Sequence, residues 1–420
     1  MLKRFFQKHD KWPLVMEIAR RVKKSGGRIL VVGGAVRDAW LQSHGYKVEL
    51  KDIDLEVYGL DKKTLKSLLK AIGRSRKKTL KEIGKQFGVF SLDSLDIAIP
   101  RTDSRTAAGM GRKPKVISQP YLSFEQATRR RDLTINALAY DPLADQILDV
   151  QGGLNDLRRG ILRAVDVASF GDDPLRVLRV MQFAGRFGFK IDLATLKLCR
   201  SISLKHLAQE RIGEEWRKLM LKSPKPSVGL EAGRQLGIFA KLHPALAHMS
   251  KADWNATKKA VDKLAKRPEV LLLAALVNCL KPDAGKKFLQ QANLPKREVL
   301  AIMLLVKLSN LIKPDDELVR CFAFELSRVS LTISDLVLLL QATGKAALAK
   351  KILSRAKVLH VADKSPKPLL QGKDLLALGV KPGKKMGEIL AQAFSQQLKG
   401  KFDDSKHRPQ KRLALEWLKV

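Results

Sequence analysis

The sequence has few of the residues that build disulfide frameworks or zinc sites. Only three cysteines, Cys199, Cys279 and Cys321, occur in 420 residues, and none forms a Cys-x-x-Cys pair. Such scattered thiols suit a reducing compartment. No apolar run reaches the roughly 18 residues that a membrane span needs. The basic start, "MLKRFFQKHDKW", has no apolar core of the kind that secretion signals carry. We therefore expect a cytoplasmic protein that does not bind a membrane.

Aromatic and acidic residues are also scarce. Aromatics make up 6% of the chain, so stacking on single-stranded bases is not expected to be the main source of affinity for a nucleic acid. Asp and Glu total 42 against 80 Lys and Arg, a formal net charge of +38. The excess is spread along the chain, which favours an extended polyanion such as RNA as the partner. A host whose proteins are generally lysine-rich is the alternative, and no feature indicates a protein partner.

The length of the chain predicts two to four modules. Residues 28–60 have the pattern strand, glycine turn, helix, strand, and residues 87–101 resemble a hairpin that turns near Asp93. The glycine-rich, basic segment 102–120 predicts a flexible loop. From about Ser123 onward helical patterns dominate, and no later strand-rich block is expected. The predicted fold class is an α/β head followed by an all-α neck, body and tail. Proline-punctuated boundaries divide it into residues 1–150, 151–223, 224–363 and 364–420.

The segment "KDIDLEVYGL" (residues 51–60) raises the first chemical question. In a strand, Asp52 and Asp54 point to the same side, and two like charges held together are unfavourable without a cation between them. A solvated strand face is the alternative for an isolated pair. The preceding "VVGGAVRD" places Gly33 and Gly34 at a strand-to-helix turn, where backbone N–H groups can approach a phosphate, and Arg37 can add a charged fork. Together these elements predict a site for a nucleotide with Mg²⁺.

Two further segments supply candidate residues. Asp96, in "LDIAIP", is either a third carboxylate of the catalytic site or a polar residue at a strand edge. In "RRRDLTINALAYD" (residues 129–141), Arg130 and Arg131 could meet a triphosphate, and Asp132 could accept a hydrogen bond from a ribose hydroxyl. Asn136 lies one turn further on if this segment is helical. A capped helix with solvated arginines is the alternative.

The ordered motifs "GGAVRD", "DID", "RRDLTINA", "GGLNDL" and "DDPLRVLR" resemble those of the class II tRNA nucleotidyltransferases. This family contains the bacterial CCA-adding enzymes and poly(A) polymerases of the polymerase-β superfamily. The resemblance runs from about residue 30 to residue 190. It implies a polymerase-β-like nucleotidyltransferase head, a neck that carries a base-recognition helix, and an RNA-binding tail.

The resemblance also implies a role for each matching residue. Asp52 and Asp54 match the pair that binds two Mg²⁺ ions, and Gly34 and Arg37 match contacts to the nucleotide phosphates. Arg131 and Asp132 match the motif that binds the nucleotide and checks for a ribose. The segment "GGLNDL" (residues 152–157) matches a flexible connection between head and neck.

Base selection is expected at "GDDPLRVLRVMQFAGRFGF" (residues 171–189). By resemblance, Asp173 and Arg176 hydrogen-bond the Watson–Crick edge of the incoming base, and Arg179 lies beside the nucleotide. A carboxylate that accepts from an exocyclic amine suits cytosine and adenine but not uracil or guanine. Two charged hydrogen bonds at roughly 1.5–3 kcal/mol each supply about a hundredfold discrimination or more. The alternative is that Asp173 only caps the helix, with Arg176 and Arg179 solvated.

Three segments depart from the family pattern or extend it. The family usually has Glu at Asp172 and Arg at Gln182, so a phosphate contact at Gln182 is not expected. In "LLLAALVNCLKPD" (residues 271–283), Asn278 and Cys279 stand where relatives with a metal-dependent HD phosphohydrolase site have His and Asp. We expect a degenerate, inactive HD-like body. The segment 372–402 resembles the tail of CCA-adding relatives, and its basic turn is either an RNA contact or a solvated turn.

The predicted function is the template-independent addition of CCA to the 3′ end of tRNA from CTP and ATP, with Mg²⁺ as cofactor. The segment "IGKQFGVF" (residues 83–90) and the tail both favour the CCA branch. The alternatives are a poly(A) polymerase and an enzyme that adds only CC or only A. A catalytically silent RNA-binding protein is disfavoured because both aspartates and the base-reading pair are present.

Overall fold

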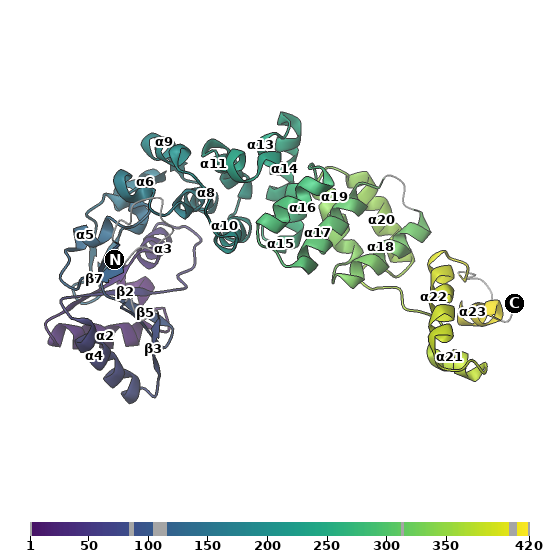
Figure 1. Cartoon of the computed structure of the whole chain (residues 1–420), viewed down its shortest axis with the longest axis horizontal. Coiled ribbons are helices and arrows are strands. Elements are labelled where there is room, and N and C mark those ends of the chain that lie inside the picture. The colour runs from purple at the N-terminus through teal and green to yellow at the C-terminus, as the bar shows by residue number, and fades with distance from the viewer. Residues whose placement is uncertain (1, 84–87, 104–115, 312–314, 403–409, 419–420) are drawn as a thin grey trace. The chain divides into compact units, whose positions relative to one another are not determined.

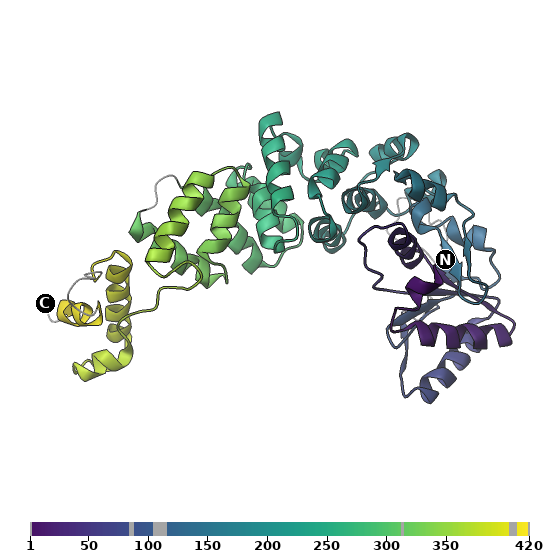
Figure 2. The same ribbon diagram turned by 180° about the vertical axis from the view of Figure 1, so that it is seen from behind.

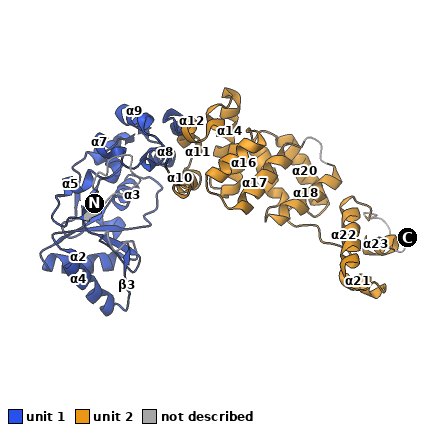
Figure 3. Ribbon diagram, viewed as in Figure 1, with its two compact units in different colours: residues 1–206, 232–238 blue, residues 207–231, 239–420 orange. Residues whose placement is uncertain are grey.

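The computed structural model describes residues 2–83, 88–103, 116–311, 315–402 and 410–418 (Figure 1). The chain divides into two compact units (Figure 3). Unit 1 contains residues 1–206 and 232–238, and unit 2 contains residues 207–231 and 239–420. The finer division into head, neck, body and tail stays a prediction. No helix in the described ranges is long and apolar enough to cross a membrane.

Unit 1 is built on a seven-stranded mixed sheet with the strand order β3-β4-β5-β2-β1-β8-β9. Its strands are β1 (Arg28–Val32), β2 (Asp54–Tyr58), β3 (Leu80–Ile83), β4 (Val89–Leu92), β5 (Leu95–Ala98), β8 (Ala139–Asp141) and β9 (Gln146–Leu148). At the centre, β2 pairs antiparallel with β1 and parallel with β5. Two short ladders accompany the sheet: β6 (Arg101–Asp103) with β7 (Val116–Ser118), and β10 (Ile161–Leu162) with β11 (Lys190–Ile191).

Helices flank this sheet and follow it in the chain. Those that lie within unit 1 are α1 (Lys3–Phe6), α2 (Trp12–Lys24), α3 (Gly34–Ser43), α4 (Lys62–Ser75), α5 (Phe124–Thr128), α6 (Gly153–Arg159), α7 (Val167–Phe170), α8 (Leu175–Phe187) and α9 (Leu193–Ser201), with the 3₁₀ turn η1 (Thr134–Asn136). Local signals set their ends. The Asp61 side chain accepts a hydrogen bond of 2.8 Å from the Thr64 N–H at the start of α4, and Gly188 ends α8 with a φ of 72°.

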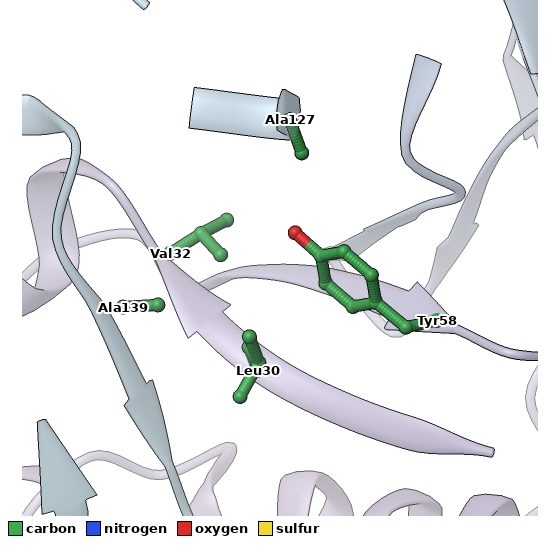
Figure 4. Packing of buried hydrophobic residues seen from close by; sticks show 5 residues of the cluster. All are labelled: Leu30, Val32, Tyr58, Ala127 and Ala139. Atoms are coloured by element: carbon green, nitrogen blue, oxygen red, sulfur yellow. The ribbon is translucent and has the colours of Figure 1, made fainter. Parts of the chain in front are cut away.

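Strand alternation gives the sheet two different faces. On one face, Leu30, Val32 and Tyr58 form a cluster with Ala127 of α5 and Ala139 of β8 (Figure 4). Asp54 and Glu56 share this face because they stand four and two residues before Tyr58 on the same strand.

The other face is covered by α2 and α4. The ring of Tyr140, which follows Ala139 and therefore points the opposite way, lies 6.3 Å from the ring of Trp12 at the start of α2. On α4, a Cβ added at Gly73 would stand 3.3 Å from Leu92 of β4. Leu92 points away from the face that carries Asp96, because its neighbour Ser91 pairs with Asp96 in the ladder. The carboxylate face and the α2–α4 face are therefore opposite sides of one sheet.

In the described residues of unit 2, helices joined by turns and loops are the only regular elements. Its helices, with α11 and α12 divided between the units, are α10 (Gln209–Lys222), α11 (Pro226–Gln235), α12 (Ile238–Leu242), α13 (Pro244–Ala247), α14 (Lys251–Lys263), α15 (Glu269–Val277), α16 (Pro282–Gln291), α17 (Lys296–Ser309), α18 (Asp316–Arg328), α19 (Ile333–Ala342), α20 (Ala346–Val358), α21 (Gly372–Ala377), α22 (Lys384–Leu398) and α23 (Gln410–Leu418). The apolar helix α15 lies at the centre and packs on α10, α14, α17 and α19. The predicted fold class, an α/β head followed by a helical remainder, is confirmed.

Several local expectations were wrong. Strands do occur after Ser123, because β8 and β9 complete the sheet beside β1; each is only three residues long, too short for an alternating pattern to stand out. Residues 129–141 are not one helix: α5 ends at Thr128, and η1 and β8 follow. Asp52 lies just before β2 and not in it. The expected loop 102–120 includes β6 and β7, while its residues 104–115 lie outside the described residues.

A buried histidine in unit 2 makes its stability dependent on pH. The Nε2 atom of His243 accepts a hydrogen bond of 3.2 Å from the indole N–H of Trp216, and its Nδ1 lies 3.2 Å from Oε1 of Gln291. The ring is 4.8 Å from that of Phe288. This arrangement needs a neutral imidazole with its proton on Nδ1. Burial lowers the pKa of His243 to about 4, and the contact to Gln291 only partly opposes this effect.

We expect unit 2 to be destabilised by mild acid. Because the folded pKa lies below the unfolded value of about 6.5, the stabilisation is complete above that value and declines as the pH falls toward 4. The contribution lost between about pH 8 and about pH 5.5 is about 1.4 kcal/mol. Urea unfolding of the wild type and of His243→Gln, which keeps polar partners but does not titrate, measures this effect. An equal pH dependence in both proteins would contradict it.

Candidate nucleotide-binding and catalytic site

Three aspartates approach one another at the centre of the sheet in unit 1. Asp54 at the start of β2 is the direct partner of Asp96 on β5 in the parallel ladder, so the two side chains project from the same face. Asp52 precedes β2 and is exposed. The Asp54 side chain is accessible to solvent on one side, and protein atoms surround it on the others. Burial raises the pKa of Asp54, Arg131 opposes this rise, and the charges of Asp96 and Asp52 add to it. The three carboxylates therefore interact electrostatically, as the sequence predicted for two of them.

This concentration of negative charge suits a divalent cation that a substrate helps to bind. Among the described residues, no group of three or more His, Cys, Asp or Glu side chains is arranged to hold a metal ion alone. Mg²⁺ usually takes one or two carboxylates and completes its shell with water and substrate phosphates. Hard carboxylate oxygens at Asp52 and Asp54, beside a strand partner of the same charge, fit that mode of binding.

The glycine turn between β1 and α3 lies close to the arginines of the third motif. Gly33 has a φ of 71°, a conformation that favours glycine, and an added Cβ would stand 2.7 Å from Nη1 of Arg131. A Cβ at Gly34 would stand 3.3 Å from the guanidinium of Arg37. The turn therefore needs glycine at position 33 for its backbone conformation, and the guanidinium of Arg131 lies directly against it.

A buried carboxylate that the sequence analysis did not select holds both arginines. Glu56, only 2% exposed, points from β2 to the same side as Asp54. Its Oε1 accepts a hydrogen bond of 3.0 Å from Nη2 of Arg130, and its Oε2 lies 3.7 Å from Nη2 of Arg131. The hydroxyl of Tyr58 donates to Oε2 at 2.6 Å. Burial, with the adjacent Glu56 charge, raises the pKa of Tyr58, so this hydroxyl keeps its proton and remains a donor.

A network of charged hydrogen bonds joins α3, the helix that follows the glycine turn, to the segment before β8. Arg37, only 4% exposed, donates from Nε to Asp38 at 2.8 Å and from Nη1 to Oδ1 of Asn136. Nδ2 of Asn136 donates in turn to Oδ1 of Asp132 at 2.9 Å. Asn136 and Asp132 are therefore neighbours as predicted, although a 3₁₀ turn and not an α-helix brings them together.

The same hydrogen-bond network extends to α8. Nε of Arg179 donates to Oδ2 of Asp132 at 2.6 Å, and Arg186 donates to Asp38 at 3.1 Å. The Arg37 guanidinium also lies 5.0 Å from the ring of Phe183 on α8. Although burial raises the pKa of Asp132, Arg179 and the donors from Asn136 and Leu133 outweigh it, and the net shift is downward. Asp132 is therefore a buried carboxylate kept ionised by its partners.

The expected base-reading pair stands at the start of α8. Oδ1 of Asp173 accepts a hydrogen bond of 3.1 Å from the Leu175 N–H, which is the capping contact given above as its alternative role. Arg176 donates 2.8 Å to the Ser169 carbonyl and 2.6 Å to the Arg130 carbonyl. Both side chains are half-buried. Arg176 thus fixes the backbone of the residue whose side chain pairs with Glu56.

Two expectations about accessibility need correction. Arg37 was expected to offer an open guanidinium fork to phosphate, but its guanidinium is buried in the chain of contacts that runs from Arg186 to Arg179. The expectation that Arg179 is solvated in the capping alternative was also wrong, because it pairs with Asp132. Gln182 is 2% exposed, and its Nε2 has no hydrogen-bond partner among the described residues. Its amide therefore lies in the interior and does not reach a solvent-exposed phosphate.

Sequence analysis missed Glu56, Asp38, Arg186 and Phe183. A signal was present for two of them: Glu56 continues the alternation of Asp52 and Asp54 on one strand face, and Asp38 directly follows Arg37. Arg186 and Phe183 contact α3 only through the tertiary packing of α8, so their spacing in the sequence gave no indication of it.

The predicted degenerate HD-like site lies in unit 2 at the end of α15. Oδ1 of Asn278 accepts a hydrogen bond of 3.0 Å from the Ser309 hydroxyl. The ammonium group of Lys345 donates 2.7 Å to the Ser309 carbonyl and 2.7 Å to Asn310. Burial lowers the pKa of Lys345, and the nearby Cys279 acts in the opposite direction. An amide, a hydroxyl and an ammonium thus meet here, and the absence of phosphohydrolase activity stays a prediction.

Comparisons with known proteins agree with this fold and these motifs. Residues 29–163 match the family described as the poly A polymerase head domain. Residues 188–249 match the probable RNA- and SrmB-binding site of polymerase A, and residues 267–408 match tRNA nucleotidyltransferase domain 2. All three matches are to domains of tRNA nucleotidyltransferases and poly(A) polymerases, and the resemblance drawn from the motifs is confirmed.

Individual relatives carry more specific names. The chain is 38% identical over 230 residues to the multifunctional CCA protein of Pasteurella multocida (strain Pm70), an alignment that covers 52% of this chain and 50% of the relative. It thus spans about half the length of that curated relative.

Solved structures show the same fold across nearly the whole chain. The Bacillus stearothermophilus CCA-adding enzyme in complex with CTP has a TM-score of 0.70 at 22% identity and covers 93% of this chain and 94% of its own. The Thermotoga maritima CCA-adding enzyme complexed with tRNA has a TM-score of 0.65 at 20% identity and covers 100% and 98%. At these identities the likeness supports the fold.

Proposed function

We propose that this protein adds CCA to the 3′ end of tRNA, without a nucleic-acid template, from CTP and ATP. The observation that carries the proposal is the pairing of Asp54 with Asp96 on neighbouring strands, beside a glycine turn against which Arg131 packs. Carboxylates, glycine N–H groups and arginine are together suited to a nucleoside triphosphate with its cation. The relatives named for CCA addition support the choice of tRNA as substrate, and tRNA maturation implies a cytoplasmic location.

Each group has a distinct part in the proposed reaction. Asp52 and Asp54 would hold Mg²⁺, which polarises phosphoryl oxygens and favours ionisation of the RNA 3′-hydroxyl when it is bound. Asp96 adds negative charge on the adjacent strand. Arg130 and Arg131, oriented by Glu56, are placed to bind the triphosphate. The N-terminus of α3 would favour the same anion, although the Gly33 N–H itself donates to the Leu138 carbonyl at 3.0 Å.

The side-chain hydrogen bonds that connect Asp38, Arg37, Asn136, Asp132 and Arg179 hold these parts in place relative to one another. Asp132 keeps its proposed role near the ribose, with Asn136 beside it, although both oxygens of Asp132 already accept hydrogen bonds within the protein. We assign Arg37 the positioning of the glycine turn, because its buried guanidinium joins α3 to Asn136. Arg179 likewise positions Asp132.

Base selection is proposed for Asp173 and Arg176. Arg176 uses two of its five N–H donors on backbone carbonyls, which leaves donors for a base edge. Its contact to the Arg130 carbonyl also links base recognition to triphosphate binding. A base that fails to pair with Arg176 would therefore be held less well at its phosphates.

Arg176→Ala should reduce the choice of nucleotide more than it reduces RNA binding. We expect the preference for CTP over UTP to fall about tenfold or more, because the lost interaction is a charged hydrogen bond. Primer extension with each nucleotide alone measures the preference, and filter binding measures RNA affinity. Arg159→Ala, an exposed arginine at the end of α6, is the matched control and should leave the preference unchanged. An unaltered preference in Arg176→Ala would exclude the role in base selection.

A poly(A) polymerase is the second candidate, because two of the matching families are named for that enzyme. The two activities are separated by end-labelled tRNA that lacks its 3′ end, incubated with Mg²⁺ and CTP, ATP or both. Three additions that begin with CTP and then stop would establish CCA addition. A long ladder from ATP alone, on any RNA, would establish a poly(A) polymerase, and no extension with retained binding would indicate a silent RNA-binding protein.

A further inference from the structure

A basic surface lies on the face of the sheet that is opposite the carboxylates. The helices α2 and α4 pack against each other there, as Figures 1 and 2 both show. Between them is a groove of about 770 Å³. It is lined by three cations, three hydroxyl groups and one leucine: Arg21, Lys24, Lys63, Ser25, Thr64, Ser67 and Leu68.

The chemistry of the lining is that of an anion-binding surface. No carboxylate lines the groove among the described residues, and its cations and hydroxyls are exposed. Arg21 is 3.1 Å from Glu17, whereas Lys24 has no ion-pair partner in the described part of the chain. Hydroxyl and amine donors are the groups that bind phosphate oxygens, and they carry no information about base sequence.

The basic character extends along both helices. α2 carries four basic residues and one acid, and α4 carries five basic residues and no acid. On α4, Lys63, Lys70 and Arg74 follow the helical spacing of seven and four residues, so they lie on one side of the helix, where Lys63 lines the groove. Lys62 and Lys66 occupy the other side of the helix and pair with Glu82. One acid does lie beside the groove: Asp61, at the start of α4, accepts hydrogen bonds from the N–H and the hydroxyl of Thr64 and partly offsets the charge of Lys63.

We propose that the α2–α4 groove binds the phosphate backbone of RNA, at a site separate from the nucleotide site. The sheet lies between the two sites, because α2 and α4 cover the face away from Asp54 and Asp96. A groove whose described lining has three cations and no carboxylate, between two helices rich in basic residues, fits a polyanion. A membrane surface is a poorer match, because Leu68 is the only apolar residue in the described lining and is half-buried. The proposal does not depend on which nucleotides the protein adds.

Charge reversal in the groove tests this proposal in the full chain. The groove variant is Lys24→Glu with Lys63→Glu, and the control is Lys23→Glu with Lys81→Glu. The control lysines are exposed and lie on α2 and on the edge strand β3, outside the groove lining, and the change in net charge is identical. The probe is a labelled single-stranded RNA with a blocked 3′ end, which cannot be extended. Anisotropy at several salt concentrations gives the affinity and its salt dependence.

We expect the groove variant to bind about tenfold more weakly and the control to change less than about twofold. For single strands each phosphate contact contributes about 0.7 to the log–log salt slope, so the slope should decrease by about 1.4 in the groove variant only. CTP incorporation into a short tRNA acceptor hairpin should stay within about twofold of the wild type in both. Equal losses in groove and control variants, or no loss in either, would overturn the proposal.

A cross-linking experiment keeps the proposal testable if charge reversal impairs folding. Ser67→Cys places a thiol in the groove and Lys81→Cys places one outside it, and each variant is labelled with a photoreactive reagent. We expect far more RNA cross-links from the Ser67→Cys variant than from the Lys81→Cys variant or from the natural cysteines of the wild type. Equal yields would exclude RNA from the groove. Protection of the groove thiol by anionic phospholipid vesicles, without RNA cross-links, would assign the surface to lipid and also overturn the proposal.

Discussion

Asp54→Asn is expected to lower nucleotide incorporation at least about a thousandfold, equivalent to about 4 kcal/mol of transition-state stabilisation. Asp54 stands directly opposite Asp96 on the neighbouring strand, and the charges of Asp96 and Asp52 add to the upward shift of its pKa. An asparagine of the same shape removes the negative charge and the ability to hold a hard cation. Single-turnover extension of end-labelled tRNA with saturating CTP and Mg²⁺ measures the chemical step directly.

Two controls separate this loss from a loss of folding or binding. RNA affinity of Asp54→Asn should stay within about threefold of the wild type, because the basic residues that bind phosphate are unchanged. Glu49→Gln removes the same charge from a side chain that is 74% exposed in the loop just before Asp52, and it should have little effect on the rate. If Asp54→Asn retained more than a tenth of the wild-type rate, Asp54 would not be a metal ligand.

Glu56→Gln is expected to raise the KM for CTP between about tenfold and a hundredfold, with kcat reduced less than about threefold. Glu56 is buried on β2 and bonds Arg130 at 3.0 Å. Without its charge, Arg130 loses the carboxylate that it bonds. Arg131 keeps the nearby charge of Asp54 and the Asn136 carbonyl, so both guanidinium groups are held less firmly. Hydrogen bonds to charged groups are worth about 1.5–3 kcal/mol, so the misplacement of one or two such bonds to the triphosphate gives this range. Steady-state extension at varied CTP measures both constants.

Tyr58→Phe provides the matched control for Glu56→Gln. It removes the 2.6 Å hydrogen bond from the hydroxyl to Glu56 but leaves the carboxylate and both arginines in place. We expect its KM for CTP to change less than about threefold. If the two variants had the same kinetics, Glu56 would support only the packing of the cluster. A fall in kcat with an unchanged KM in Glu56→Gln would contradict its role in nucleotide binding.

Much of the site was predictable from short segments of sequence because its parts are local. A glycine pair between a strand and a helix, and aspartates two residues apart at a strand, each have a chemical meaning that does not depend on distant residues. The same holds for the β4–β5 hairpin, where burial alternates along each strand. The motifs in order were sufficient to indicate the family, and the family models agree.

Other local predictions failed where tertiary contacts override propensity. The segment 129–141 has the composition of a helix, yet Asp132 and Asn136 adopt a turn in which both side chains reach partners on α3 and α8. β8 is only three residues long and forms because β1 offers an unpaired edge beside it. A short strand of this kind is stabilised by its neighbour rather than by its own residues.

The sequence by itself determined the fold class, the motif residues of the candidate nucleotide site and the excess of positive charge. Only the tertiary structure decided which charged groups remain open to a ligand. Both Arg37 and Arg130 belong to motifs that suggest a phosphate contact. Arg37 is buried between Asp38 and Asn136, whereas Arg130 is held by Glu56 with its side chain 25% exposed. Lys63 and Lys66 show the same effect on a single helix, α4. Because of the way the helix packs, Lys66 pairs with Glu82, whereas Lys63 lines the groove. The reason is that charges pair with whatever the fold brings within a few ångströms, and those partners come from distant parts of the chain.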